Sequence, residues 1–276
     1  MPTGFTTYQI RMGIRTRGIS MRSFIILPLI ICSLVQFPAY AGVDAGFVPE
    51  DCPKAVELYN KGTLSKDPGE KEVFFREAIP LCTDPEVISK ALNNLADVYE
   101  KKGDFIRAII NYRKAIAVKK DFVTPYVGVG DIFARLGDYY SAYVMYGNAL
   151  KIEPEDGDAV QGRKKTEEAY KKKMVLYFDR DSARISENYI YRLQLIGEAV
   201  TNSKRIDITG FTCDIGSKAY NKRLSLRRAQ SVASYFKSHY PIDSKRFVVQ
   251  GKAEPLLPDS NEEARTLNRR VEVIIE

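Results

Sequence analysis

The sequence predicts a two-domain protein in which an all-α domain of helical repeats precedes an α/β domain. Between residues 50 and 155, small and aromatic residues recur with a period of 34, a spacing typical of stacked helix pairs. Farther along, residues 205–210 alternate polar and apolar side chains as a strand does, and residues 220–236 carry a stripe at four-residue steps, as a helix does. A polar, lysine-rich segment over residues 166–173, a linker or the end of a capping helix, separates the two patterns. Each pattern therefore predicts a domain with its own core.

Residues 1–41 are predicted to be an N-terminal extension followed by a secretory signal peptide. Met21–Ser23 forms a short basic start, residues 24–37 form an apolar run, and Ala39–Ala41 is an A-x-A cleavage signal. Because this signal is complete from Met21 onwards, we expect the true start there, although the arginine-rich residues 1–20 also allow a transit peptide. The mature chain is then expected to be secreted.

Residues 1–41 also bear on the net charge of the mature chain and on whether it has a membrane anchor. The apolar run is shorter than the ~20 residues that a membrane-spanning helix needs. Cys32 follows Ile31 rather than a small residue, so no lipid anchor is predicted. Removal of residues 1–41 takes four arginines and no acids, which lowers the formal charge from +7 to +3. We therefore expect a protein peripheral to the outer membrane at most, without a nucleic-acid partner.

Residues 42–165 are predicted to form about three helix pairs. Small residues let antiparallel helices approach closely, aromatic residues fill the gaps, and Gly103 and Gly137 end helices. The pattern resembles the tetratricopeptide repeat, with Lys54–Leu81 as a degenerate first unit and Val160–Lys173 as a capping helix. Two units related by a shift of 34 carry the resemblance: Leu92, Leu95, Ala96, Tyr99, Gly103, Ala108, Tyr112 and Ala115, followed by Tyr126, Val129, Gly130, Phe133, Gly137, Ala142, Tyr146 and Ala149.

The resemblance implies a concave groove lined by the first helix of each pair. Such a groove takes an extended or helical protein segment, which implies an envelope protein, not identified by the sequence, as the partner. Alternatively, the repeats are a spacer whose concave face is only solvated. The surface is polar and mildly acidic, and the residues expected on it are Lys90, Asn93, Asp97, Glu100, Thr124, Val127, Asp131 and Ala134.

The mature chain has three cysteines and the sequence has one histidine, which limits the chemistry available. Cys52 precedes the first helix of the degenerate repeat and Cys82 ends its second, so we expect a disulfide between them in an oxidising compartment, with Cys213 as a free thiol. No C-x-x-C motif is present, so no metal site is predicted. A catalytic pair of Cys213 and His239 lacks an orienting group, and the intervening helix separates the two. We expect neither an enzyme nor a cofactor.

An arginine interrupts the apolar stripe of the helix in the second domain. Tyr220, Leu224, Arg228, Val232 and Phe236 lie on one helix face, so Arg228 is placed where burial is expected. A cation there needs an acidic partner. The loop over residues 210–216 precedes the N-terminus of this helix, where backbone N–H groups favour anions. The residues therefore predict a small carboxylate-binding site.

These residues resemble the OmpA-like peptidoglycan-binding domain over residues 174–276. The motifs are Gly210-x-Thr212 before a turn that closes at Gly216, then Asn221-x-x-Leu224-Ser225-x-x-Arg228-Ala229-x-x-Val232, and Asn268–Val273 at the end. The resemblance implies a βαβαβ-type fold that closes on a final strand. Together with the signal peptide, it implies a location in the periplasm, associated with the cell wall or the outer membrane. It also implies a site that binds the free carboxylate and ammonium of diaminopimelate in peptidoglycan stems, with Arg228 on the carboxylate. The residues that it assigns to binding are Phe178, Asp179, Thr212, Cys213, Asp214, Asn221, Leu224, Arg228, Arg265 and Arg269.

One position departs from the family pattern. Cys213 stands where the family has an aspartate that contacts the ammonium group, and Asp214 is displaced by one residue. A neutral thiol cannot pair with a cation, but Asp214 could do so if the turn rotates. Two functions follow as alternatives: a cell-wall adaptor that binds peptidoglycan and recruits a protein through its repeats, or a protein-interaction scaffold whose OmpA-like domain has lost its ligand.

Overall fold

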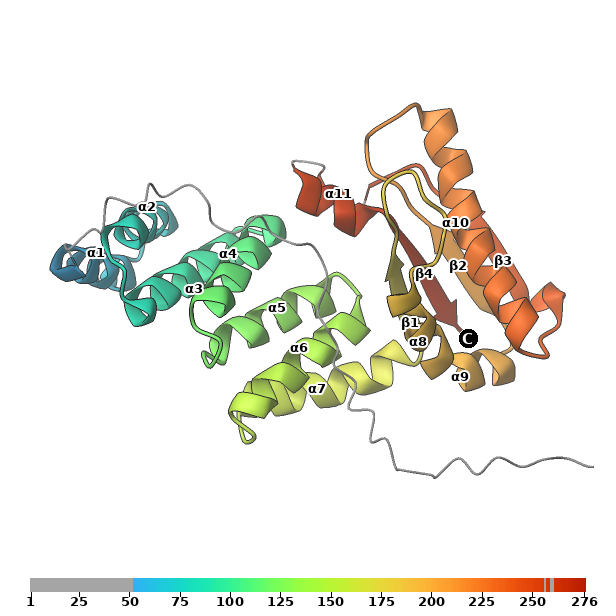
Figure 1. Cartoon of the computed structure of the whole chain (residues 1–276), viewed down its shortest axis with the longest axis horizontal. Coiled ribbons are helices and arrows are strands. Elements are labelled where there is room, and N and C mark those ends of the chain that lie inside the picture. Colours follow the sequence, from blue (N-terminus) through green and yellow to red (C-terminus); the bar gives the residue numbers. More distant parts are fainter. Residues whose placement is uncertain (1–51, 256, 259–260) are drawn as a thin grey trace, which may run out of the picture. The chain divides into compact units, whose positions relative to one another are not determined.

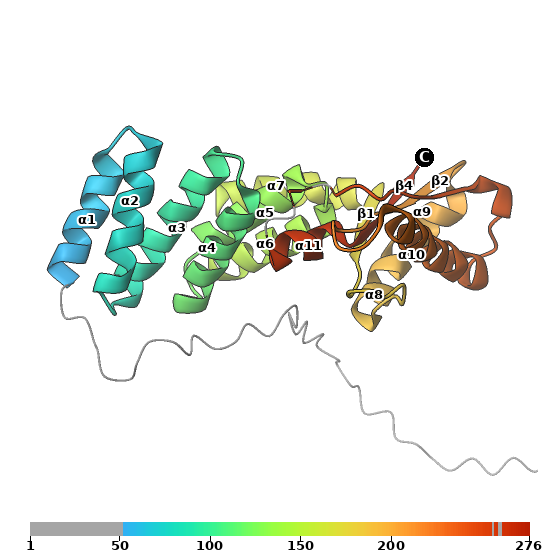
Figure 2. The same ribbon diagram turned by 90° about the horizontal axis from the view of Figure 1, so that it is seen from above.

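The repeat region is a succession of antiparallel helices. A computed structural model of the protein describes residues 52–255, 257–258 and 261–276, so the predicted extension and signal peptide (residues 1–41) lie outside the described residues. Figures 1 and 2 show the repeat helices side by side in chain order. They are α1 (Cys52–Leu64), α2 (Pro68–Ala78), the short 3-10 helix η1 (Ile79–Leu81), α3 (Pro85–Lys101), α4 (Phe105–Val118), α5 (Thr124–Arg135), α6 (Tyr139–Ile152) and α7 (Gly157–Tyr170).

Aspartates and glycines set the ends of these helices. Asp104 and Asp138 cap α4 and α6, where each carboxylate accepts a hydrogen bond from a backbone N–H in the first turn. Gly103 and Gly137 precede them with φ of 75° and 77°, a conformation that glycine adopts without steric cost. The 34-residue spacing of these signals reproduces the same helical hairpin twice. The predicted capping helix is α7, which begins at Gly157, slightly before Val160.

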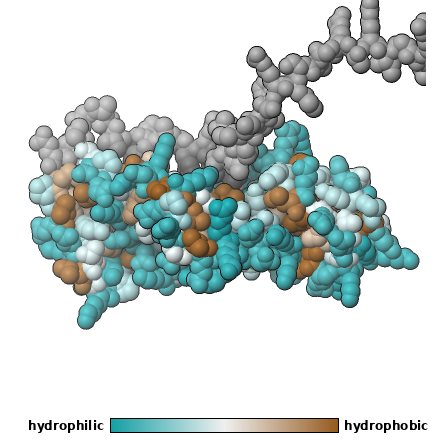
Figure 3. All heavy atoms as spheres, turned by 90° about the horizontal axis from the view of Figure 1, so that it is seen from below, coloured by the Kyte–Doolittle hydropathy of each residue, from teal (hydrophilic) through white to brown (hydrophobic). Residues whose placement is uncertain are grey.

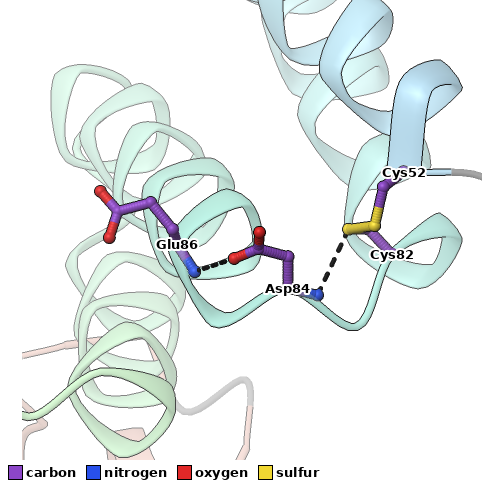
Figure 4. Close-up of a disulfide and its surroundings, with 4 residues drawn as sticks. All are labelled: Cys52, Cys82, Asp84 and Glu86. Carbon is purple, nitrogen blue, oxygen red and sulfur yellow. Dashed lines mark hydrogen bonds between the residues drawn. A yellow bond between two sulfur atoms is a disulfide. The ribbon is translucent and has the colours of Figure 1, made fainter.

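A disulfide closes the first hairpin. Cys52 at the start of α1 is bonded to Cys82, which follows η1, and Figure 4 shows the bond beside the start of α3. The backbone N–H of Asp84 donates to the sulfur of Cys82 at 3.3 Å, and the Asp84 carboxylate caps α3 through the N–H of Glu86 at 2.7 Å. The bridge therefore fixes both the first hairpin and the entry into the next one. Cys213 is a free, buried cysteine.

The second domain is a mixed sheet with helices. Its strands have the order β1-β4-β2-β3, with β4 antiparallel to both β1 and β2, and β2 parallel to β3. The last strand of the chain thus lies in the middle of the sheet, where Val273 pairs with both Met174 and Ile208. The elements are β1 (Lys173–Tyr177), α8 (Glu187–Leu195), α9 (Gly197–Asn202), β2 (Ile206–Gly210), α10 (Lys218–His239), the 3-10 helix η2 (Ser244–Arg246), β3 (Phe247–Gly251), α11 (Glu262–Asn268) and β4 (Arg270–Ile275).

Helix α10 packs directly on the sheet and joins its core. Ala229, Val232 and Phe236 pack with apolar residues of β1, β2, β4 and α8 in one buried cluster. The approach is close at the end of β2, because a Cβ added to Gly210 would lie 1.9 Å from the backbone oxygen of Ser225. Glycine is therefore required there, and it lets the middle of α10 reach the loop that follows β2.

The connection between the two domains is short. The predicted connection over residues 166–173 consists of the end of α7, a turn, and Lys173, which is already the first residue of β1. Tyr170 is buried and packs edge-on against Tyr140 of α6, with ring centroids 5.4 Å apart. Asp138, the cap of α6, lies 3.6 Å from the guanidinium of Arg192 on α8. Helices next to the connection therefore contact the sheet domain.

The surface in Figure 3 is largely hydrophilic, with small separate apolar areas. Among the described residues, exposed large apolar side chains such as Leu64, Val73 and Tyr191 lie on different helices. No helix in the described part of the chain has the length and apolar character needed to cross a membrane.

Candidate functional site

A pocket lies where two loops of the sheet domain meet α10. The loop after β1, the loop after β2, the first half of α10 and the end of α11 all contribute side chains. The residues that line the pocket are Arg180, Asp181, Thr212, Cys213, Ile215, Asn221, Leu224, Arg228 and Arg269.

Arg228 is fully buried and is held by backbone carbonyls. Its Nε donates to the carbonyl of Ser182 at 2.8 Å, its Nη1 to that of Phe211 at 3.2 Å, and its Nη2 to that of Asp179 at 3.0 Å. A guanidinium has five N–H groups, so one on each Nη is left without a partner among the described residues. Two such N–H groups match the two oxygens of a carboxylate.

The charge of Arg228 is not neutralised within the described structure. No described carboxylate forms an ion pair with it, although the sequence led us to expect an acidic partner; the three carbonyls take that place. Burial, and then the like charge of Arg269, lower the pKa of Arg228 to about 10. The side chain therefore remains protonated at neutral pH, in surroundings that disfavour its charge. A bound anion would relieve this cost.

Two further polar groups of the pocket are buried. The side chain of Thr212 is 1% exposed, and its hydroxyl has no hydrogen-bond partner among the described residues. A buried hydroxyl without a partner costs about 1–3 kcal/mol, which a bound ligand with a polar group would recover. Arg269 is 7% exposed and already donates to Phe178, Glu262 and Thr266. Arg269 therefore contributes positive potential, whereas Arg228 and Thr212 have hydrogen-bonding capacity left.

The residues predicted to line the groove lie on α3 and α5, and their carboxylates already contact other side chains of the repeats. Glu100 accepts a hydrogen bond from the Tyr112 hydroxyl at 3.0 Å and pairs with Arg135 at 3.2 Å. Asp131 accepts from the Tyr146 hydroxyl at 2.6 Å. Burial raises the pKa of Glu100, while Tyr112 and Arg135 act in the opposite direction. The acidic character of this face is therefore already compensated in part by the repeats themselves.

The other groove residues have mixed surroundings. Asp97 pairs with Lys101 at 2.7 Å, and Lys90 pairs with Glu86 at 2.9 Å. Asn93 is 8% exposed, and its side-chain oxygen has no partner among the described residues. Thr124 is exposed, and Val127 and Ala134 are half-buried. The groove thus has one buried acceptor with unused capacity.

Comparison with known proteins assigns both regions. The sequence model of the OmpA family matches residues 177–269, and that of the tetratricopeptide repeat matches residues 89–122. The chain carries an OmpA-like domain after tetratricopeptide repeats. Both matched families are binding domains.

Individual relatives resemble the OmpA-like domain. The outer membrane protein Omp38 of Acinetobacter baumannii is 32% identical over 100 residues, which are 35% of this chain and 28% of Omp38. The peptidoglycan-associated lipoprotein of Pseudomonas putida is 26% identical over 134 residues, 46% of this chain and 81% of that protein. The crystal structure of the peptidoglycan-associated lipoprotein from Burkholderia pseudomallei aligns with 37% of this chain over 89% of its own length, with 23% identity and a TM-score of 0.35. The chain thus spans less than a third of Omp38, a relative named as an outer membrane protein.

The pocket of the OmpA-like domain brings together six of the residues that the sequence indicated: Thr212, Cys213, Asn221, Leu224, Arg228 and Arg269. Phe178 and Asp179 do not line the pocket but contact Arg228: the centroid of the Phe178 ring lies 5.6 Å from the guanidinium carbon, and the Asp179 carbonyl accepts a hydrogen bond from it. Asp214 and Arg265 do not line the pocket and pair with each other at 3.1 Å.

Sequence reasoning missed three lining residues, namely Arg180, Asp181 and Ile215. The first two directly follow Phe178 and Asp179, so the charged pair after the strand was the available signal. Ile215 belongs to the turn that contains Cys213 and carried no signal of its own.

Proposed function

We propose that this chain is a non-catalytic adaptor of the bacterial cell envelope. Its OmpA-like domain binds peptidoglycan through the diaminopimelate of the stem peptide, and its repeats hold a protein partner in the periplasm. The buried Arg228 supports this most strongly, because two of its N–H groups lack a described partner and no described carboxylate neutralises it. The unpartnered hydroxyl of Thr212 in the same pocket agrees with a polar ligand.

The hydrogen-bond donors of the pocket indicate which chemical group the ligand presents. A carboxylate would accept from both Nη groups of Arg228, a bidentate arrangement that a planar guanidinium favours. The relative from Pseudomonas putida is by name peptidoglycan-associated, which makes a cell-wall carboxylate the source that we propose.

The repeats are proposed to take a protein segment that carries donors or positive charge. The groove offers the buried oxygen of Asn93 and the carboxylates of Asp97, Glu100 and Asp131. Because tyrosines and basic residues of the repeats already contact these carboxylates, we expect modest affinity from charge alone.

A second function is favoured by one specific observation. Cys213 is buried in the pocket in place of an acid, and Asp214 is paired with Arg265 outside it. This favours the alternative in which the OmpA-like domain has lost its ligand and the whole chain is a protein-interaction scaffold.

Co-sedimentation with purified diaminopimelate-type sacculi separates the two functions. The wild-type mature chain should sediment with the sacculi, and Arg228→Lys should reduce affinity by about tenfold or more, since an ammonium cannot reproduce the guanidinium fork and a charge-assisted bond contributes about 1.5–3 kcal/mol. Arg228→Ala should bind sacculi no better than Arg228→Lys does, and it is expected to fold less stably, because three carbonyls lose their donor. Arg228→Lys is therefore the variant that better separates binding from folding.

Arg227→Ala is the matched control, because Arg227 is the neighbouring arginine on the exposed face of α10. It removes the same charge and should bind as the wild type does. Thermal unfolding of each variant should accompany the assay, so that loss of folding is not mistaken for loss of binding. If neither the wild type nor Arg228→Lys sediments with the sacculi, the scaffold function is left; if both sediment equally, Arg228 does not carry the binding.

A further inference from the structure

The pocket contains one acid that sequence reasoning did not consider. Asp181 is the acidic residue among the described residues that line it, facing the same space as Arg228, Thr212 and Cys213. A ligand that carries a carboxylate and an ammonium on one carbon needs a cationic and an anionic group within one small site. The thiol of Cys213 cannot supply the anionic group in its neutral form, so the question is which carboxylate does.

Asp214 is poorly placed for this role. Its Oδ1 lies 3.1 Å from the Nε of Arg265, a residue of α11. Neither residue lines the pocket. To reach a ligand there, Asp214 would have to leave a charged partner, at the cost of that ion pair.

Asp181 is held at the pocket by the same arginine that would bind the carboxylate. A turn runs from Asp179 to Ser182, closed by the N–H of Ser182 donating to the carbonyl of Asp179 at 3.3 Å. The carbonyls of both end residues accept from Arg228. Arg228 therefore fixes the two ends of the turn that carries Asp181, so the acid and the guanidinium keep a defined relation.

The backbone of Asp181 is itself unusual. Its φ is 54°, and it is the one residue other than glycine with positive φ in the described part of the chain. Glycine is favoured at such a position, and aspartate is among the few other residues that tolerate it. Asp181 therefore places a carboxylate at a turn position that glycine would ordinarily occupy.

The carboxylate of Asp181 has weak partners of its own. The hydroxyl of Tyr220 donates to it at 3.3 Å, and the Nε of Arg180 lies 3.9 Å away. Its side chain is 66% exposed. A ligand ammonium can therefore approach it from the solvent side without displacing a buried ion pair.

We propose that Asp181 is the specificity-determining acid of this pocket, which binds the ammonium group of the stem peptide in place of an acid at position 213. This inference rests on the proposed function, since it concerns the second charged group of the same ligand. It predicts a chain that recognises a zwitterionic amino-acid terminus with an acid from the loop after β1 and an arginine from α10.

Isothermal titration of the full mature chain with a murein tripeptide that ends in meso-diaminopimelate tests this. Asp181→Asn removes the charge and is compatible with positive φ, so it should fold. It should lower affinity about fivefold, the size of an ion pair with a solvent-exposed partner. Asp158→Asn, which removes an equal charge from α7, should leave affinity unchanged.

A second probe isolates the ammonium group. Acetylation confined to the side-chain amine of diaminopimelate should cost the wild type about the same fivefold, and should cost Asp181→Asn nothing further. If Asp181→Asn binds both peptides as the wild type does, the inference is overturned. If Asp214→Asn instead removes the sensitivity to acetylation, the acid is Asp214, and the inference is equally overturned.

Failure of the proposed function would look different. In that case the wild-type chain would not bind the tripeptide, and Arg228→Lys would change nothing, so both proposals would fall together. Binding by the wild type that weakens in Arg228→Lys but not in Asp181→Asn would overturn only the assignment of Asp181.

Discussion

The pocket of the OmpA-like domain and the groove of the repeats are both polar, but their charged groups differ in how far they are already satisfied. In the pocket, Arg228 has two N–H groups without a described partner, and no described carboxylate pairs with it. In the groove, Glu100 and Asp131 accept hydrogen bonds from tyrosines of the adjacent helices. The difference teaches that unused hydrogen-bonding capacity, rather than polarity, indicates a site for a small ligand.

The two regions also differ in how they are stabilised. The groove belongs to repeats whose first hairpin is closed by the Cys52–Cys82 disulfide. The pocket is held without covalent links by Arg228, which connects α10 to the loops after β1 and β2. The disulfide closes the first hairpin, whereas the contacts with the sheet domain come from later helices of the repeats. Its loss is therefore expected to leave the pocket largely unaffected, and the following predictions test this separation.

The largest expected effect concerns the disulfide. Its two cysteines are 30 residues apart, so the bridge should contribute about 3–4 kcal/mol to the free energy of unfolding of the repeats by the chain-entropy relation. Cys52→Ser combined with Cys82→Ser should lower repeat stability by that amount in a denaturant titration. Tripeptide affinity at the pocket should not change, because Cys213 takes no part in the bridge. As a control, Cys213→Ser should leave repeat stability as it is.

A thiol titration checks the same assignment directly. Protein made in an oxidising compartment and denatured without reductant should show one free thiol per mature chain, that of Cys213. Three thiols would mean that the bridge does not form. A coupled loss of tripeptide affinity on reduction would break the separation between groove and pocket.

A smaller effect is expected when the pocket receives a second acid. Cys213→Asp should tighten tripeptide binding by a few-fold at most in the wild-type background. Asp181 already lines the pocket as the proposed partner of the ammonium group, and an exposed ion pair contributes about 1 kcal/mol or less. In the Asp181→Asn background the same change should restore most of the lost affinity. Isothermal titration of the wild type, the two single variants and the double variant completes a double-mutant cycle.

Equal gains in both backgrounds would mean that positions 181 and 213 act independently. No gain in either would indicate a pocket that has lost its ligand. The cycle therefore sharpens the contrast between a pocket with unused donors and a groove whose carboxylates Glu100 and Asp131 are already partnered.

Much of the fold could be predicted because local signals agree with the tertiary structure. The 34-residue period repeats whole hairpins, with caps at Asp104 and Asp138 and glycines at 103 and 137. The OmpA-like domain was recognisable from its motifs, yet β3 and the helices α8 and α9 carried weaker patterns and were not assigned individually. Arg228 stood out because a charge on an apolar helix face is costly unless it is paired.

The details of the pocket could not be predicted because they depend on contacts between distant residues. The turn at Asp179–Ser182 is fixed by Arg228, which is 46 and 49 residues away from the two carbonyls that it binds. Neither the positive φ of Asp181 nor the pairing of Asp214 with Arg265 follows from local sequence. Likewise, Tyr112 and Tyr146 were expected to fill gaps, and their hydroxyls also bind the groove carboxylates.

The smallest expected effect tests whether the groove carboxylates are compensated. Burial raises the pKa of Glu100, so the native state holds this proton more tightly than the unfolded chain does, and stability falls as pH rises through that range. Glu100→Gln removes the buried charge, and the amide oxygen can still accept from Tyr112. The variant should therefore be more stable than the wild type at about pH 7, by less than about 1 kcal/mol, because loss of the exposed Arg135 partner offsets part of the gain.

Urea titrations at about pH 7 and about pH 4 check this sign, since the difference should vanish where the wild-type carboxyl is protonated. Glu57→Gln is the opposite case, because a hydrogen bond from Lys61 lowers the pKa of Glu57 on an exposed helix, and no gain at neutral pH is expected there. If Glu100→Gln instead destabilised the repeats at neutral pH, the carboxylate would be more than compensated by Tyr112 and Arg135. The groove would then be stabilised by its own charge network, and a basic partner would have to compete with that network for Glu100.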